Sequence, residues 1–196
     1  MKILSILIVV LFVVSMSFLM YGNQGIPKGI SVVEGFDGKR YAGTWYEIAR
    51  LDHGFEKGLN HVSAEFSPRE DGGFDILNKG FNAKTGAWEN SKAKAFFIDR
   101  PDLGRMKVSF SGPFYGAYNI IDLDKENYSY AMVTGPKTHY FWILSRQKTI
   151  DPAIMQKLVQ KAIGLGFKLD KIIYVDQKDS TVPPEGVATP ATAPAN

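Results

Sequence analysis

The 196-residue chain contains no cysteine. Disulfide bonds, thiol nucleophiles, cysteine-ligated zinc and iron–sulfur clusters are therefore excluded. The absence does not place the chain in a reducing compartment, because many exported bacterial proteins also lack cysteine.

The chain also lacks a large excess of charge of either sign. Its 23 Lys and Arg residues face 20 Asp and Glu residues, which leaves a formal net charge of +3. Binding to nucleic acid requires clustered lysine and arginine, so no nucleic acid partner is expected.

Signals for catalysis and for metal binding are scarce. The three histidines are His53, His61 and His139, and two of them, His53 and His139, fall in expected loops. A metal or acid–base site needs several groups to converge, so we interpret these histidines as solvated or locally bonded. Ser145 has no Gly-x-Ser-x-Gly context. We therefore expect no enzyme, no catalytic residue, no metal site and no cofactor.

The start of the chain is a long apolar run. Lys2 precedes it, only three serines interrupt residues 3–21, and no further charge appears before Lys28. Its 19 residues are enough to cross a hydrocarbon layer of roughly 30 Å at about 1.5 Å per helical residue. Residues 1–22 are therefore predicted to be either an export signal or a membrane-anchoring helix, with the anchor slightly favoured.

The ends of the folded part are marked by composition. Residues 23–30 read as a Gly/Pro linker, and residues 178–196 are rich in Pro, Ala and Thr. A segment with so few apolar residues cannot offset its ordering entropy by burial, so this tail is expected to be disordered. The folded domain is predicted at residues 31–177.

Runs that favour β-strands recur between turn residues throughout this domain. The eight runs are residues 43–51, 60–67, 74–82, 91–99, 105–111, 116–123, 128–134 and 140–146. Short loops between them predict an all-β fold, an eight-stranded antiparallel up-and-down β-barrel without exposed edges. One α-helix should follow, capped by Asp151 with Pro152 at its first position, and it should pack on the outside; residues 171–176 read as a short final strand.

The alternation of side chains predicts which residues face the interior. Trp142 shares its parity with Arg146, so both should point inward. Asn78 and Asn82 share a parity with Ile76, so an amide-bearing interior is expected. A barrel of this size can hold one small ligand. For each residue alone, packing in a filled core or a plain internal hydrogen bond remains an alternative.

Three motifs carry a resemblance to a known family. Residues 39–59 (KRYAGTWYEIARLDHGFEKGL) contain Gly-x-Trp, residues 122–133 read DLDKENYSYAMV, and residues 142–146 read WILSR. In this order they resemble the lipocalins. The phrases ILNKGFN at 76–82 and VSFSGPFYGAYNII at 108–121 resemble the bacterial subgroup related to apolipoprotein D. The resemblance covers about residues 33–177.

The resemblance implies structural roles for the best-matched residues. Gly43 and Trp45 of the first motif would close one end of the barrel, and Arg146 would lie over the Trp45 ring and bond carbonyl groups of the N-terminal segment. Ligand selection would then depend on the open end, where we name five candidate ligand-binding residues: Asn78, Asn82, Tyr118, Tyr140 and Trp142.

The resemblance also implies a function, the binding, storage or transport of fatty acids or lysophospholipids in the bacterial envelope, facing the periplasm. A ring-bearing apolar ligand such as a terpenoid or a haem-like pigment is the alternative, a lipid-modifying enzyme is a weaker one, and a homodimer is left open. Members of the subgroup often carry a lipid-modified cysteine after the signal. This chain has none, so its membrane partner would be held through residues 3–21 or the protein would be released.

Overall fold

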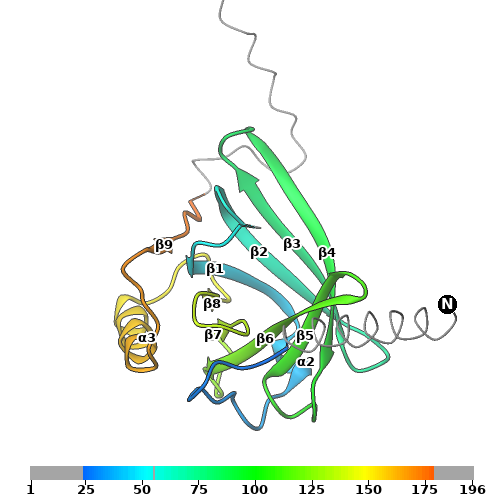
Figure 1. The fold of residues 1–196 in the computed structure, drawn as a ribbon. Coiled ribbons are helices and arrows are strands. Elements are labelled where there is room, and N and C mark those ends of the chain that lie inside the picture. The colour runs from blue at the N-terminus through cyan, green and yellow to red at the C-terminus, as the bar shows by residue number, and fades with distance from the viewer. Residues whose placement is uncertain (1–23, 55, 179–196) are drawn as a thin grey trace, which may run out of the picture.

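The computed structural model describes residues 24–54 and 56–178 (Figure 1). The predicted N-terminal apolar helix and nearly all of the predicted C-terminal tail lie outside these residues and stay predictions. Within the described ranges, no helix has the length and apolarity needed to span a bilayer.

Eight antiparallel strands form a closed barrel. Each strand pairs with the next along the chain, and β1 also pairs with β8, which closes the ring and confirms the predicted fold (Figure 1). The strands are β1 (Gly43–Leu51), β2 (Leu59–Pro68), β3 (Phe74–Asn82), β4 (Ala87–Phe97), β5 (Arg105–Ser111), β6 (Phe114–Leu123), β7 (Tyr130–Thr134) and β8 (Phe141–Ser145).

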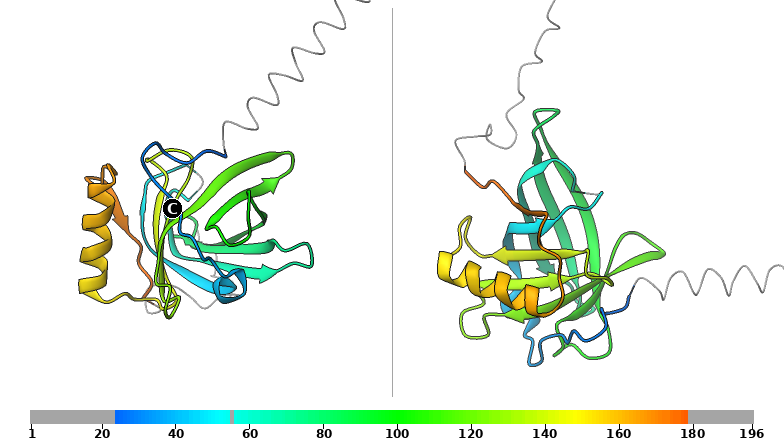
Figure 2. Two further views of the ribbon diagram at one scale, coloured as in Figure 1. Left: turned by 90° about the horizontal axis from the view of Figure 1, so that it is seen from below. Right: turned by 60° about the vertical axis from the view of Figure 1, so that its left-hand side comes forward.

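A helix after the barrel lies against its outer wall, as predicted. Helix α3 (Pro152–Gly164) begins where the Asp151 carboxylate accepts hydrogen bonds from the N–H groups of Ala153 and Ile154. Leu158 and Ala162 form its buried face. The helix lies on one side of the barrel (Figure 2). The short strand β9 (Ile172–Tyr174) then pairs with the second half of β1.

The barrel wall separates two hydrophobic clusters. Inward side chains of the strands form one cluster, which includes Trp45 and Phe66. Outward side chains of β1, β7 and β8 form the other, together with α3. Strand β8 illustrates the alternation, because Leu144 belongs to the inner cluster and Ile143 to the outer one. Because both faces of β8 are buried, its residues are apolar on both faces.

Several predicted boundaries were wrong by a few residues. Strand β4 begins at Ala87 and not at 91, because the ladder with β3 continues to the pair Asn82↔Ala87. Strand β6 begins at Phe114, so Phe114 and Tyr115 belong to a strand and not to a loop. The four-residue helix α2 (Gly38–Tyr41), capped by Asp37, was not predicted, because a single turn leaves no periodic pattern.

Helix α2 and the start of β1 close one end of the barrel. The Arg146 guanidinium lies 3.9 Å from the centre of the Trp45 ring, the arrangement that the resemblance implied. It also donates hydrogen bonds to the carbonyl oxygens of Arg40, Thr44 and Tyr128 at 2.7, 2.9 and 3.3 Å. One side chain therefore joins α2, β1, β8 and the β6–β7 connection.

Gly43 makes room for this contact. Its φ is +95°, and a Cβ atom there would lie 3.4 Å from Nη1 of Arg146. Glycine adopts this backbone conformation without the steric cost that an L side chain incurs.

We predict that Arg146→Met lowers the free energy of unfolding by about 2–4 kcal/mol, because three charge-assisted hydrogen bonds and a cation–π contact are lost. Urea denaturation measures this. The matched control is Arg100→Met, since Arg100 is 62% exposed and pairs with Asp102 on the surface; its effect should stay within about 0.5 kcal/mol. Equal losses in the two variants would contradict the role assigned to Arg146.

Candidate ligand-binding site

Large aromatic side chains fill one part of the barrel interior, and small side chains line another part. Aromatic rings of Tyr41, Trp45, Phe66 and Phe74 pack together toward the end that α2 closes. On β2 and β4, by contrast, three inward positions carry alanine: Ala64, Ala93 and Ala95. These two strands flank β3, and their short side chains leave room beside the aromatic floor.

Trp142 and Tyr118 both pack against the inner cluster. The Tyr118 hydroxyl lies 2.7 Å from that of Tyr41, and burial raises the pKa of Tyr118 well above its ordinary value. The Tyr118 phenol therefore remains neutral and is already engaged with another phenol. Tyr140 lies just before β8, and its ring is nearly parallel to that of Trp142, with the centroids 6.4 Å apart.

The two asparagines have different surroundings. Asn78 lies opposite Ala64 on β2 and Ser91 on β4, on the inward side of β3. Its Nδ2 is buried and has no hydrogen-bond acceptor among the described residues. A buried amide donor left in this way costs about 1–3 kcal/mol, so Asn78 is suited to a ligand that brings an acceptor.

Asn82 instead organises the β3–β4 connection. Its Oδ1 accepts hydrogen bonds from the backbone N–H groups of Lys84 and Thr85, and its Nδ2 donates to Glu89 at 2.7 Å. The Asn82 side chain, which shares its parity with Asn78, therefore makes its hydrogen bonds within its own hairpin.

A buried, hydrogen-bonded pair of Glu47 and Arg50 inside the barrel was not predicted from the sequence. Arg50 Nη1 donates to Glu47 Oε1 at 2.6 Å, and Glu47 and Arg50 are 3% and 1% exposed. Arg50 Nη2 donates to the carbonyl oxygens of Glu56 and Leu59 at 3.0 Å each. A regular alternation would place Ala49 on the face of Glu47, but the β1–β8 register shifts between these residues and turns Arg50 inward.

Burial raises the pKa of the Glu47 carboxyl well above its ordinary value, and the nearby Glu56 charge adds to the effect, while Arg50 opposes it. Desolvation of a carboxylate inside a barrel outweighs one close arginine in this arrangement.

A second set of polar side chains extends from the pair of Glu47 and Arg50 toward the open end. Glu56 Oε2 accepts a hydrogen bond from Trp142 Nε1 at 3.1 Å and lies 3.1 Å from His53 Nε2. Burial tends to raise the Glu56 pKa, but His53 and Trp142, with help from Arg50, lower it overall. His53 is buried and locally paired, one of the two interpretations that the sequence left open. In the described ranges no three His, Asp or Glu side chains are grouped to hold a metal ion.

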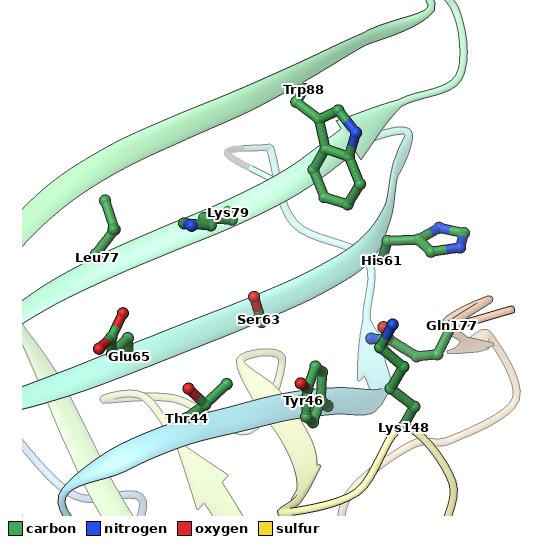
Figure 3. A pocket seen from close by; sticks show the side chains of 10 residues that line it. All are labelled: Thr44, Tyr46, His61, Ser63, Glu65, Leu77, Lys79, Trp88, Lys148 and Gln177. Atoms are coloured by element: carbon green, nitrogen blue, oxygen red, sulfur yellow. The ribbon is translucent and has the colours of Figure 1, made fainter. Parts of the chain in front are cut away.

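Two hollows indent the wall from outside. One of about 260 Å³ lies over the outer face of β1 to β4, where His61, Lys79 and Trp88 line it together with Lys148 and Gln177 from the chain after β8 (Figure 3). The other, of about 720 Å³, lies over β3 and β4 beside the β5–β6 hairpin. Its lining includes outward side chains of β3 and β4, and it also includes Ile76 and Ala93 of the inner cluster.

We predict that Glu47→Gln changes how stability depends on pH. A carboxyl with a raised pKa keeps its proton in the folded chain where the unfolded chain has lost it, so the free energy of unfolding falls as pH rises above 4.5. The fall amounts to about 1.4 kcal/mol for each unit by which the pKa is raised. In Glu47→Gln this fall should be absent.

Thermal or urea unfolding between mildly acidic and neutral pH measures the difference. Glu65→Gln, on the exposed outer face of β2, is the matched control and should keep the profile of the unaltered chain. A Glu47→Gln profile parallel to that of the unaltered chain would show that Glu47 ionises as an ordinary carboxyl.

The chain is similar to known proteins of the same fold. A family model described as the lipocalin-like domain matches residues 36–177. The outer membrane lipoprotein Blc of Vibrio cholerae is 44% identical over 168 residues, covering 86% of this chain and 98% of that protein. The protein of the same name from Escherichia coli K12 is 51% identical over 154 residues, covering 79% and 86%. Mouse apolipoprotein D is 31% identical, covering 74% and 79%.

Among solved structures, insecticyanin from the tobacco hornworm superposes with a TM-score of 0.66 at 19% identity, covering 81% of this chain and 89% of that one. At this identity the likeness concerns the fold alone.

Proposed function

This chain belongs to the lipocalin family, and on that premise we propose that its barrel binds single-tailed amphiphiles, fatty acids or lysophospholipids, for storage or transport in the cell envelope. Burial of the acyl chain would supply the affinity, at roughly 0.8 kcal/mol for each methylene group removed from water. The inner wall that supports this proposal is mostly apolar, with small side chains beside an aromatic floor.

The observation that carries the proposal is the buried Nδ2 donor of Asn78, which has no acceptor within the described part of the chain. A carboxylate or phosphate oxygen of a head group would accept its hydrogen bond. Trp142 and Tyr140 would form the wall beside the acyl chain, and Tyr118 would lie below it. Arg50 Nε is a second buried donor without an acceptor among the described residues.

A ring-bearing apolar ligand is the alternative, favoured by the near-parallel rings of Tyr140 and Trp142. A rigid ring system would stack on these rings, whereas a flexible chain would not need them. Competition between a terpenoid and a lysophospholipid for the same protein separates the two. In either case the proposed role is binding, with no catalytic residue.

The proposed location is the bacterial envelope, with the barrel in the periplasm. The names of the Vibrio cholerae and Escherichia coli relatives place those proteins at the outer membrane as lipoproteins. This chain has no cysteine to carry a lipid, so residues 3–21 either retain it at a membrane or are removed. N-terminal sequencing of protein from membrane and soluble fractions distinguishes these two fates.

We predict that Ala64→Trp abolishes binding of lysophospholipid, because the new ring would occupy the space beside Asn78, which pairs with Ala64. Isothermal titration or native mass spectrometry measures the bound lipid. Glu65→Trp, one position further along β2 and on the outer face, should bind as the unaltered chain does.

The same pair of variants tests whether the interior is a filled core. An inserted tryptophan in a filled core destabilises the fold by about 1–3 kcal/mol or more. A strongly destabilised Ala64→Trp, together with no lysophospholipid bound to the unaltered chain, would overturn the proposed function.

We predict that Asn78→Leu weakens lysophospholipid binding about tenfold, because the head group loses one hydrogen bond. The unliganded protein should be no less stable, since the substitution removes a buried amide without an acceptor. Asn82→Leu should do the opposite, lowering stability through the hairpin and leaving affinity unchanged. An unchanged affinity in Asn78→Leu would remove this residue from the binding site.

A further inference from the structure

The hairpin of β5 and β6 exposes large apolar side chains. Phe110 near the end of β5 and Phe114 at the start of β6 are 57% and 69% exposed. Ser111 pairs with Phe114 where the hairpin closes. This hairpin extends from the side of the barrel opposite to α3 and β9 (Figure 1). Exposed phenylalanines concentrated on one projecting turn indicate a surface that another phase or molecule covers.

The barrel wall is incomplete next to this hairpin. The β4–β5 ladder runs only from Lys94↔Ser109 to Phe97↔Met106. Strand β4 nevertheless continues to Ala87, paired with β3 alone in this part. The hollow of about 720 Å³ lies here, and Phe110 lines it together with Ile76 and Ala93 of the inner cluster. The hollow therefore lies beside the unpaired part of β4, which we call the slot between β4 and β5, and it borders two residues of the inner cluster.

Lysines surround the same slot. Lys92 and Lys94 line it from β4, and the Lys107 Nζ lies 4.8 Å from the centre of the Tyr115 ring, which also lines it. The acidic residue in the lining is Asp75, whose carboxylate is 2.9 Å from a guanidinium nitrogen of Arg69. The slot thus presents a positive rim beside exposed aromatic rings.

We propose that this hairpin face docks on an anionic phospholipid surface, with Phe110 and Phe114 in the boundary between head groups and acyl chains and the β4–β5 slot turned toward the bilayer. Apolar side chains with adjacent lysines are the composition that such interfaces bind. The docking does not depend on the proposed function. Its consequence, that an amphiphile passes sideways from the bilayer into the barrel, rests on that function.

Charge favours a lipid surface over a second copy of the chain as the occupant. A symmetric pair of copies would bring the same patch together twice and place the lysine rims of both copies opposite one another. An anionic bilayer instead offers these lysines a negative surface.

Site-specific labelling of the full chain tests the proposal, because the chain contains no cysteine of its own. Phe114→Cys carries an environment-sensitive fluorophore, and Tyr174→Cys on β9 carries the same label as the matched control, at a residue that is 63% exposed. Both proteins are reconstituted with vesicles of phosphatidylcholine alone or mixed equally with phosphatidylglycerol. Penetration of the label is read by quenching with brominated lipid, so the apolar N-terminal run does not decide the outcome.

The expected result is a blue-shifted, strongly quenched label at 114 in the anionic vesicles and a water-exposed label at 174. Added Lys92→Gln and Lys94→Gln should weaken docking by about fivefold for each lysine. Equal quenching at 114 and 174 would overturn the proposal. A blue shift at 114 that depends on protein concentration without vesicles would overturn it in favour of a second copy.

Measurement of lysophospholipid binding in solution separates this proposal from the proposed function. A quenched label at 114 in a protein that binds no lysophospholipid leaves the docking surface intact and refutes the carrier role. Lysophospholipid binding with an unquenched label refutes docking alone.

Discussion

Both edges of β1 are paired, and the closed barrel depends on this strand. One edge pairs with β8, while the other pairs first with β2 and then with β9. No edge of β1 is left to recruit another strand. Because closure gives every strand an inner and an outer face, it also decides which side chains meet a ligand and which meet α3. The contact of Arg146 with Trp45 secures the start of the same strand.

The bulge within β1 changes the chemistry of the interior. By shifting the register between Glu47 and Ala49, it turns Arg50 into the barrel beside Glu47. Burying charges is costly unless they are paired and hydrogen-bonded, and backbone carbonyl groups of the β1–β2 connection complete the coordination of Arg50. The polar side chains of this part of the barrel form a layer above an apolar floor: Glu47, Arg50, His53 and Glu56. Such a layer fits an amphiphile better than a uniformly apolar molecule.

Unequal strand lengths explain the shape of the wall. Strands β3 and β4 are paired over their whole common length, whereas β5 leaves β4 after a short ladder. The wall therefore has a slot beside the β5–β6 hairpin, and the hairpin carries its exposed phenylalanines there. The opposite side is covered by α3, whose apolar stripe packs on β1, β7 and β8. One side of the barrel is thus covered by a helix, and the other side carries the slot.

The sequence alone determined the barrel, because eight short runs with turns between them and three ordered motifs allow few other folds. It also determined α3, from the Asp151 cap, and the inward direction of Trp142, from its parity with Arg146. These features depend on local periodicity, which a chain carries in its residue order. The buried pair of Glu47 and Arg50 was decided only by the tertiary structure, since a bulge leaves no mark in the alternation of residues. The separation of Asn78 from Asn82 and the β4–β5 slot were decided in the same way, because hydrogen-bond partners and ladder lengths depend on which strands meet.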